Sequence, residues 1–454
     1  MAVRNCARVR RDRALPLIAL LAALTLGTAP GALPGPTFPL RVSHSQRYLE
    51  DSTGTPYRVT GDTAWSLVAQ LESSDVIRYL DDRAARGFNA IIVNLLEHKF
   101  SSNAPADREG VRPFLAAGAF GDPNPAYFAK AHRVVEEAGT RGIAVWLCPA
   151  YLGWGGGDEG FFAEIAAAGP SALREYGRFV AGRFKDLPNI VWMLGGDYAF
   201  PSEFRWLGDE LAAGLREGGA RQLMSAHGGQ TTAVETFGDR PWLAVNTVYS
   251  YAADLRPALL AAYTQTSVRP FVLIEGVYEG EHDARPEQIR RQAWTAMLTG
   301  AAGQFFGNNP IWHFDGPTLF PFAGNWREAL DSVGARDIAR LSAFLRARKW
   351  TALEPDRNGR LVTIPNDTPP IAAAWTAARD LALAYFPARS WTSRELSLNL
   401  GGFPRPMTAR WFDPSSDAPP RAGGVLRAAA DGQRLSVPGD RDGAADWVLV
   451  LETR

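Results

Sequence analysis

Two acidic residues stand directly after short apolar runs in this sequence. Asp197 follows NIVWMLGG, and Glu275 ends FVLIE. Each run is preceded by a segment with helical periodicity, which predicts a buried strand that follows a helix. Two carboxyl groups that meet at strand ends can protonate a leaving oxygen and attack the neighbouring carbon or activate water against it. The pair therefore predicts hydrolysis of a glycosidic bond.

The residues around Asp197 indicate how its carboxyl group is presented. Gly195 and Gly196 allow a sharp turn that lifts the side chain towards the mouth of a barrel. The alternative is that Asp197 caps a helix that begins near Pro201. We assign Asp197 as the acid/base, because neighbouring aromatic side chains would exclude water and raise its pKa.

Glu275 has no basic neighbour in the sequence, and we assign it as the nucleophile or base. Glu279 and Glu281 lie in the same loop and are its rivals; either could bind a sugar hydroxyl or simply be solvated. Retaining and inverting mechanisms differ in the separation of the two carboxyl groups, which a sequence does not give. Both stereochemical outcomes therefore stay open.

Other polar and aromatic residues follow predicted strands and could bind the substrate. For each of them the alternative is a capping or packing role. These candidates are Asp62 and Trp65 after the first strand, Glu97 and His98 after the second, His227 at the fifth, Tyr249 and Tyr251 after the sixth, Glu279 and Glu281 after the seventh, and Asn308, Trp312 and His313 after the eighth.

Composition and short motifs exclude several other classes of function. Lys+Arg and Asp+Glu both count 48, and this balance argues against nucleic acid or an anionic membrane surface as a partner. Six His, no HExxH and no cysteine cluster predict no metal site and no cofactor. GWGGGDEG lacks the Lys–Ser/Thr of a phosphate loop, so it is interpreted as a lid or turn, and no GxSxG motif is present.

Residues 1–38 have the pattern of a secretory leader. A basic segment precedes an apolar stretch of about a dozen residues, which is too short to span a bilayer, and small and Pro-rich residues follow. We expect a removed signal peptide, no membrane span, and a secreted or periplasmic protein. Beyond the leader the one cysteine is Cys148, in an apolar run, which predicts a buried inert thiol.

Residues 39–348 alternate apolar runs with helical patterns. Eight parallel strands with helical crossovers predict an α/β fold, a (β/α)8 TIM barrel. The expected strands are residues 57–65, 88–96, 143–149, 189–194, 221–227, 242–248, 271–275 and 302–307.

Residues 349–454 lose the helical periodicity. Short strand-like runs separated by Gly, Pro and Asp predict a small C-terminal antiparallel β-sandwich that supports the barrel. Trp411 and Trp447 are its large apolar groups, and we expect them to anchor its core or to pack it on the barrel.

Several motifs together resemble the apiosidase-like glycoside hydrolases. They are GDTAW, the RxxxGFN segment at residues 83–89, NIVWMLGGD, the EGxYEG loop and the RRxAW…GAAG run, while RWFDP and DWVLVLE resemble the C-terminal domain of that family, which carries a collagen-binding label. The resemblance covers nearly all of the chain after the leader. It implies a barrel with a sandwich, Asp197 and Glu275 as the catalytic pair, and an activity like the release of apiose from pectic side chains.

Two functions compete at this stage. The first is a glycoside hydrolase acting on an oligo- or polysaccharide of plant or microbial origin, which we expect to be a monomer. The second is a secreted protein with an inactive barrel that binds glycan or collagen through its sandwich. A decayed barrel would be expected to lose at least one carboxylate, and both are present, which favours the enzyme.

Overall fold

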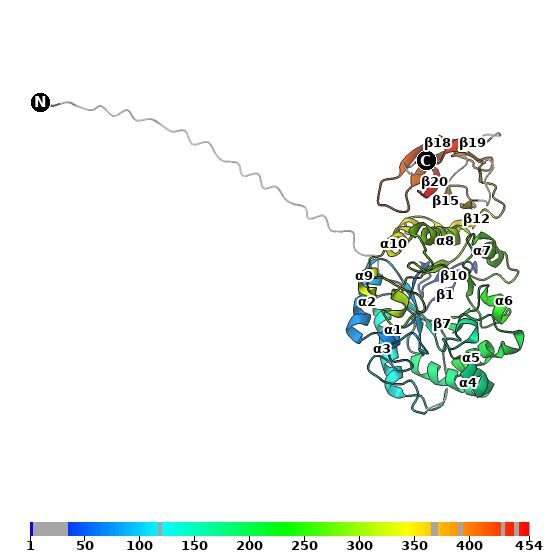
Figure 1. The fold of residues 1–454 in the computed structure, drawn as a ribbon. Coiled ribbons are helices and arrows are strands. Elements are labelled where there is room, and N and C mark those ends of the chain that lie inside the picture. Colours follow the sequence, from blue (N-terminus) through cyan, green and yellow to red (C-terminus); the bar gives the residue numbers. More distant parts are fainter. Residues whose placement is uncertain are drawn as a thin grey trace. The chain divides into compact units, whose positions relative to one another are not determined.

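Eight parallel strands form the central sheet of the computed structural model (Figure 1), in the order β8-β7-β6-β5-β4-β11-β10-β9. A parallel bridge between Ser225 and Val245 joins the two ends of this order, as closure into a barrel requires. The expected TIM barrel is confirmed. The strands are β4 (Val59–Thr63), β5 (Ala90–Asn94), β6 (Ala144–Cys148), β7 (Ile190–Gly195), β8 (Met224–His227), β9 (Asn246–Tyr249), β10 (Phe271–Glu275) and β11 (Gly303–Phe306).

The structure describes residues 1–2, 35–116, 120–364, 371–388, 394–427, 432–439 and 445–453. The predicted signal peptide falls almost entirely on residues outside these ranges, so it stays a prediction. Among the described helices, none combines the length and the apolar composition that a bilayer crossing requires. A three-stranded antiparallel sheet that the sequence did not indicate precedes the barrel, with strands β1 (Arg41–Val42), β2 (Leu49–Glu50) and β3 (Pro56–Tyr57).

Side chains on each barrel strand alternate between the barrel interior and the surrounding helices. On β6, Trp146 and Cys148 pack inside the barrel, while Val145 and Leu147 pack outside it. A strand buried on both faces needs apolar residues at every position, which is why these strands appear as unbroken apolar runs. Burial raises the pKa of the Cys148 thiol, in agreement with an inert cysteine.

Helices connect successive barrel strands and cover the outside of the sheet. Asn124 begins one of them as predicted, because its side chain accepts a hydrogen bond from the Ala126 amide and Pro125 occupies the first turn. The helices are α1 (Leu67–Gln70), α2 (Ser73–Ala85), α3 (Pro125–Thr140), α4 (Phe162–Phe184), α5 (Trp206–Glu217), α6 (Ala233–Phe237), α7 (Arg256–Tyr263), α8 (Pro286–Leu298), α9 (Trp326–Ala329) and α10 (Val333–Arg346), with 3₁₀ turns at Trp154–Gly156, Ser202–Phe204, Ile311–His313 and Trp350–Ala352.

After the barrel the chain forms two antiparallel sheets, of six strands and of three. Trp411 and Trp447 are both buried in the apolar core that residues of the two sheets share, which gives the expected sandwich. The sequence missed β12 and β18. The larger sheet contains β12 (Leu353–Pro355), β14 (Ala372–Thr376), β15 (Leu381–Phe386), β20 (Trp447–Thr453), β17 (Met407–Phe412) and β18 (Arg421–Leu426), and the smaller one β13 (Val362–Thr363), β16 (Glu395–Leu398) and β19 (Gln433–Ser436).

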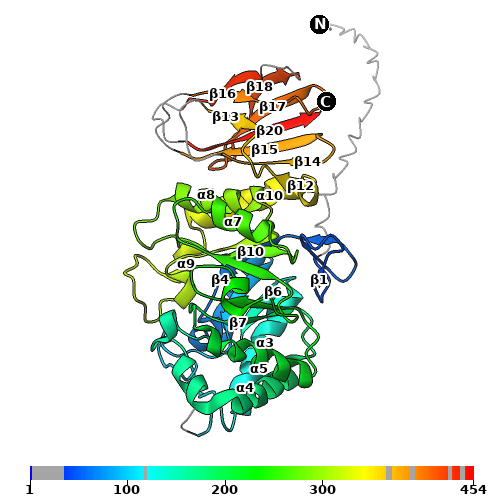
Figure 2. The ribbon, with the colours of Figure 1, turned by 90° about the vertical axis from the view of Figure 1, so that its right-hand side faces the viewer.

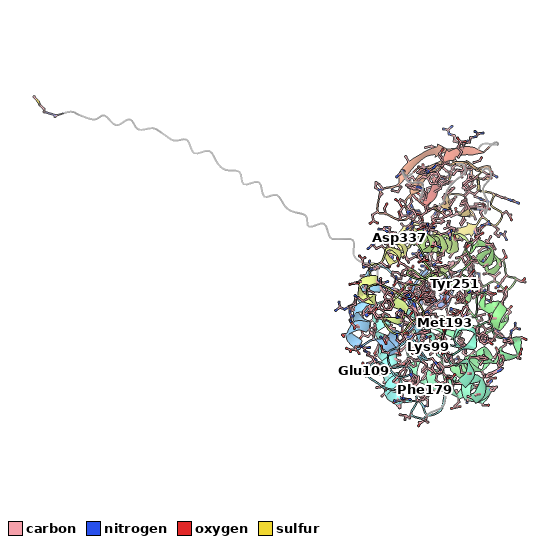
Figure 3. All side chains as sticks on the ribbon, viewed as in Figure 1. Lys99, Glu109, Phe179, Met193, Tyr251 and Asp337 are labelled. Carbon is pink, nitrogen blue, oxygen red and sulfur yellow. The ribbon has the colours of Figure 1, made fainter. Side chains whose placement is uncertain are left out.

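The sandwich packs on helices α8 and α10 of the barrel, which lie between the barrel strands and the larger sheet in Figure 2. Trp294 of α8 stacks on Tyr385 of β15, with ring centroids 6.1 Å apart. Beside them Arg290 binds Asp446 through two 2.8 Å contacts and Asp337 through a third at 2.8 Å. Figure 3 labels Asp337 on α10 near this boundary. A buried, fully paired arginine and a shared apolar core tie the two regions together, while the exact domain boundaries stay a prediction.

Candidate active site

A small cavity of about 90 Å³ contains both predicted catalytic carboxyl groups. It lies where loops after the barrel strands converge, the region that carries active sites in barrels of this type. Its lining is aromatic and acidic. The residues are Trp65, Asn94, Phe100, Tyr151, Glu159, Asp197, Tyr251, Glu275, Tyr278, Glu281, Trp312, Leu319 and Phe320.

The two glycines before Asp197 are required by their surroundings. Gly195 and Gly196 have φ values of +97° and +149°, a backbone region that side chains disfavour. A Cβ atom on Gly195 would meet the His227 carbonyl oxygen at 2.4 Å, and one on Gly196 would meet the Tyr151 ring at 2.5 Å. The turn therefore brings the backbone against the cavity wall and presents Asp197. The helical elements that follow begin after Pro201 and Arg205, so Asp197 caps neither of them.

The environment of Asp197 favours the protonated acid. Burial is the main cause that raises its pKa to about 7, and the negative charge of Glu275 adds to it. His227 and the Tyr249 hydroxyl act in the opposite direction but do not cancel these effects. The Oδ1 atom is buried without a hydrogen-bond partner among the described residues. A carboxyl group with this pKa can hold a proton at neutral pH and give it to a leaving group.

Glu275 is aimed into the cavity by an irregularity in its strand. Leu273 packs outside the barrel and Ile274 inside it, so regular alternation would turn Glu275 outwards. The register between β10 and β9 shifts between Leu273 and Glu275, and such a bulge re-aims the next side chain. The carboxylate then accepts from His227 Nε2 at 2.8 Å through Oε2 and from the Tyr251 hydroxyl at 2.8 Å through Oε1.

His227 is the positive partner of this carboxylate. Its Nδ1 lies 2.8 Å from the Gly228 carbonyl oxygen, and its Nε2 faces Glu275. Both neighbours accept hydrogen bonds, so the ring that satisfies them carries two protons. Burial lowers the pKa of His227, but the hydrogen bond to Glu275 and the charges of Glu275 and Asp197 outweigh this, and the net shift is upwards.

Two further acidic residues line the cavity. Glu281 is 5 % exposed, and Trp312 donates its indole N–H to Oε1 at 2.8 Å. Burial raises the pKa of Glu281 to about 7. Glu159 is half-buried on the Gly-rich loop after β6, and burial raises its pKa as well. The two predicted catalytic residues thus share the cavity with two other carboxyl groups.

Four predicted binding residues lie in or directly behind this cavity. Trp65 and Trp312 form walls, and the Trp65 indole donates to the Tyr278 hydroxyl at 3.0 Å. His227 and Tyr249 lie behind Glu275 and Asp197 with ring centroids 5.3 Å apart, and both change the pKa of Asp197. These residues orient the acidic pair or form its walls.

Asp62 is not among the residues that line the cavity. Gly61 faces the barrel interior, where an added Cβ atom would meet the Phe305 ring at 2.1 Å, so the next side chain points to the outer layer. There the Asp62 carboxylate accepts from Tyr79 at 2.8 Å and pairs with Arg83 at 3.3 Å, fully buried. Burial raises the pKa of Asp62 to about 6, although Arg83 and Tyr79 act against this. Its contacts here are structural.

Glu97 and His98 also lie outside the cavity lining. Glu97 accepts from the Ser66 hydroxyl at 2.7 Å and from the backbone amide of Phe100 at 3.1 Å. These bonds fix the loop after β5, and that loop carries Phe100 into the cavity wall. The His98 ring lies 2.9 Å from Glu164.

Glu279 and Asn308 act together at the start of α10. Glu279 accepts from the Asn308 side chain at 2.9 Å and from the Gly334 amide at 2.8 Å. A carboxylate at a helix N-terminus satisfies a free backbone amide and complements the helix dipole. In this structure both residues hold the loops after β10 and β11 together, and neither lines the cavity. His313, a further candidate, is buried against Asn309 at 2.8 Å.

Sequence reasoning missed several cavity residues. Glu159 stood inside GWGGGDEG, a run interpreted only as a lid or turn, and an acid between flexible glycines was the available signal. Asn94 ends β5, inside the predicted strand 88–96, and was not singled out there; the other missed residues lie in loops, where no periodic signal exists. They are Phe100, Tyr151, Tyr278, Leu319 and Phe320.

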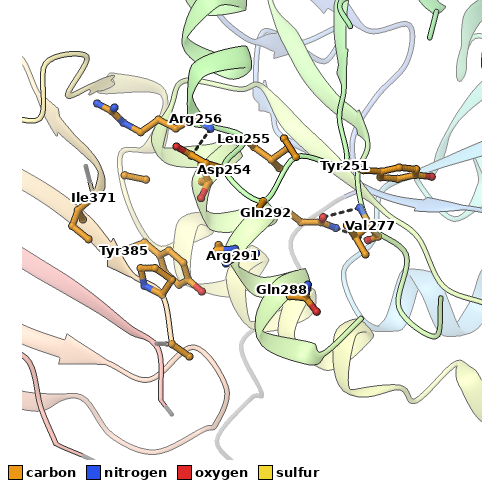
Figure 4. Close-up of a pocket in the computed structure, with 16 residues that line it drawn as sticks. Tyr251, Asp254, Leu255, Arg256, Val277, Gln288, Arg291, Gln292, Ile371 and Tyr385 are labelled. Carbon is orange, nitrogen blue, oxygen red and sulfur yellow. Dashed lines mark hydrogen bonds between the residues drawn. The ribbon is translucent and has the colours of Figure 1, made fainter. Parts of the chain in front are cut away.

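Two larger hollows lie beside the sandwich. One, of about 340 Å³, is lined by the loop after β9, by α8 and by Tyr385 (Figure 4). Gln292 there binds both backbone polar groups of Val277 at 2.9 Å, and Tyr251 extends away from Arg291 and Tyr385. The other, of about 530 Å³, contains the Lys349–Asp380 ion pair. Among the described residues, neither of these larger cavities is lined by two buried carboxyl groups. The volume of a cavity therefore does not identify the active site in this structure.

Within the described part of the chain, no group of three or more His, Cys, Asp or Glu could hold a metal ion. The side chains in and directly behind the cavity offer carboxyl groups, the His227 imidazole and aromatic walls. Such a set can move protons and stabilise positive charge at a sugar ring.

Comparison with known proteins identifies a family. The family model described as "Apiosidase-like, catalytic domain" matches residues 43–352. Among solved structures, a glycoside hydrolase family 5 protein from Bacteroides vulgatus ATCC 8482 has a TM-score of 0.77 at 23% identity and covers 91% of this chain and 93% of its own. A structure titled glycoside hydrolase has a TM-score of 0.77 at 21% identity, covering 91% and 96%.

A more distant neighbour is the family 5 mannosidase from Rhizomucor miehei, with a TM-score of 0.50 at 13% identity over 68% of this chain and 97% of that one. Among curated protein sequences none matches. At these identities the solved structures support the barrel fold.

Proposed function

Since this chain belongs to the apiosidase-like family and is a glycoside hydrolase, we propose that it cleaves a plant or microbial polysaccharide with Asp197 as acid/base and Glu275 as nucleophile. One observation carries this proposal. The two carboxyl groups line one cavity but have opposite environments, because Glu275 receives two hydrogen bonds while Asp197 Oδ1 receives none. Paired acids with divergent environments divide the roles of acid and nucleophile.

The division of roles follows from these contacts. In the first step Asp197 gives its proton to the leaving oxygen while Glu275 attacks the anomeric carbon, which forms a glycosyl–enzyme ester. In the second step Asp197 takes a proton from water, which displaces Glu275 and releases the sugar. The His227 imidazolium and the Tyr251 hydroxyl hold Glu275 in place for the attack.

This mechanism retains the configuration of the anomeric carbon, and proton NMR of the first product formed measures it directly. A product of retained configuration supports Glu275 as nucleophile. An inverted product would instead make Glu275 the base that activates water, and would leave Asp197 as the acid.

The substrate we propose is a pectic side chain from which a terminal sugar such as apiose is released. The family match supports this choice. The test is incubation with pectic, arabinogalactan and hemicellulosic oligosaccharides, followed by mass spectrometry of the released sugars. Release from another glycan would change the substrate and keep the reaction, whereas no release from any of them, with binding retained, would favour a glycan-binding protein.

We also propose that the protein is exported. The support is the basic, apolar and Pro-rich order of its first 38 residues. Expression in the native host, followed by N-terminal sequencing of the protein from the periplasm and the medium, checks this. A full-length chain confined to the cytoplasm would contradict it.

A further inference from the structure

The candidate cavity is lined by more carboxyl groups than the proposed reaction uses. Four of its lining side chains are carboxyl groups, namely Glu159, Asp197, Glu275 and Glu281. None of the described residues that line it is Lys, Arg or His. Catalysis by two carboxyl groups accounts for Asp197 and Glu275, and it leaves Glu159 and Glu281 without a role.

The nearest cations are already engaged with other acids. His227 is paired with Glu275, and it lies behind that carboxylate. Lys99 reaches towards the Gly-rich loop, but its Nζ contacts both oxygens of Asp158 at 3.0 and 3.1 Å. The positive charge of Lys99 acts on Glu159 from outside the lining, and no Lys, Arg or His among the described lining residues offers a direct ion pair to a ligand carboxylate.

In the described part of the chain, the Glu281 carboxylate has one oxygen free to accept a hydrogen bond from a sugar hydroxyl group. Trp312 holds its Oε1, and no described residue donates to its Oε2. The Trp312 ring is itself fixed by edge-on contact with Phe100, at 4.9 Å between centroids. A rigid carboxylate beside an aromatic wall suits a neutral sugar, whose C–H face packs on the ring while a hydroxyl donates to the acid.

We propose that the sugar unit bound in this cavity carries no carboxylate, and that Glu281 and Glu159 are the specificity residues that reject uronic acids. The reason is that a uronate would add its negative charge to a partly buried site whose described lining contains four carboxyl groups and no Lys, Arg or His, and like charges brought together in a binding site disfavour the wrong partner. The inference rests on the proposed function only in that a glycan occupies the cavity. It identifies which sugars are excluded, and by which residues.

The test uses saturation-transfer NMR with matched pairs of monosaccharides at about pH 8, where Asp197 and Glu281 are ionised. The pairs are glucose and glucuronate, galactose and galacturonate, and mannose and mannuronate. We expect the neutral member of at least one pair to bind about 10-fold or more tightly than its acid, the discrimination that a difference of about 1.4 kcal/mol gives.

Two variants assign this discrimination to residues. Glu281→Gln should reduce it several-fold, and Glu159→Gln, on the half-buried loop, provides a second reading if the first variant folds poorly. Asp283→Asn is the matched control, because it removes one charge from an exposed site in the same loop as Glu281. If Asp283→Asn lowered the preference for neutral sugars as much as Glu281→Gln does, the preference would come from the overall negative charge of this region. That result would overturn the assignment to Glu281.

The outcomes separate this inference from the proposed function. Uronates that bind wild-type protein as tightly as their neutral partners, or sugars that do not bind at all, overturn the inference. A protein that hydrolyses a uronide retains the proposed reaction and loses this specificity. Conversely, neutral sugars that bind selectively without any hydrolysis would retain the charge selection and reject the enzyme.

Discussion

His227 and Glu275 form a buried pair in which Nε2 lies 2.8 Å from Oε2. The second ring nitrogen of His227 faces a carbonyl oxygen, so the imidazolium is fixed in orientation and in protonation. The imidazole thereby holds the Glu275 carboxylate in a fixed position, while no cation is hydrogen-bonded to Asp197 among the described residues. The asymmetry between the two acids comes from the hydrogen bonds that Glu275 receives from His227 and Tyr251, and from the burial of Asp197, which is the main cause of its raised pKa.

Glu275→Gln and Asp197→Asn should each fold normally and lose most of the hydrolytic activity. Each substitution keeps the side-chain volume and removes the charge or the acid, and acid–base help alone contributes ~10²–10⁴ in rate. Steady-state rates on the identified substrate, with circular dichroism as the folding control, measure this. A variant that keeps more than half the wild-type rate would exclude that residue from the reaction.

The value of kcat/KM should fall as the pH rises above about 7. Asp197 must be protonated to act as the acid, its pKa is raised to about 7, and the proton is lost above that value. Glu281 has a pKa of about 7 as well, so Glu281→Gln is the control. The basic limb should persist in this variant; its disappearance would assign the titration to Glu281 instead.

Tyr251→Phe should lower kcat by roughly 10- to 100-fold, with little change in melting temperature. The hydroxyl donates to Glu275 Oε1, and hydrogen bonds to charged groups contribute about 1.5–3 kcal/mol. Tyr263→Phe is the matched control, since no hydrogen bond of its hydroxyl is found in the described structure and it lies outside the cavity lining. Equal rates for the two variants would contradict a positioning role for Tyr251.

Asp62→Asn should reduce stability and leave the activity of the folded enzyme unchanged. It removes one ionic partner of the buried Arg83, which keeps Asp82, and hydrogen bonds to charged groups contribute about 1.5–3 kcal/mol. Asp81→Asn, at the exposed pair with Arg141, should cost less than about 1 kcal/mol. Thermal unfolding and active-site-normalised rates compare them; an unchanged melting temperature with reduced activity would return Asp62 to the substrate site.

A chain ended at Arg348 should be less soluble or melt at a lower temperature. The truncation uncovers Trp294 and Phe344, which pack against the larger sheet of the sandwich. Differential scanning fluorimetry and sedimentation of the truncated chain check this. A truncated barrel that is soluble, equally stable and fully active would show that the sandwich is independent, and would revive a binding role for it.

The sequence predicted the barrel because its strands are buried on both faces and appear as separate apolar runs. It predicted that Asp197 and Glu275 lie in one cavity because each acid interrupts such a run at its carboxyl end. It could not decide the direction of Asp62, which depends on whether Gly61 or its neighbour faces the barrel interior. Glu159 was missed because its loop has no periodicity, and loop conformation is set by tertiary contacts.

The direction of the Glu275 side chain was also not predictable from the sequence, because it depends on a β-bulge. Strict alternation from Leu273 would have turned this carboxylate away from the cavity, and the sequence contains no sign of the register shift. The sequence prediction considered strand ends without asking which face each residue occupies, and the structure places Glu275 in the cavity lining. The sequence can thus predict that residues at the carboxyl ends of the strands lie near the active site. The direction in which each side chain points requires the structure.

The contact of α8 and α10 with the sandwich limits how this enzyme can be rebuilt. Helix α8 follows the loop that carries Glu281. The face of α8 that meets the sandwich contains Trp294, which stacks on Tyr385, and Arg290, which binds Asp446. A chimera that joins this barrel to a foreign sandwich must therefore transplant the complementary faces of both helices. Without them a new partner would leave Arg290 with Asp337 as its acidic partner but without Asp446, and would leave the Trp294 indole without the Tyr385 ring.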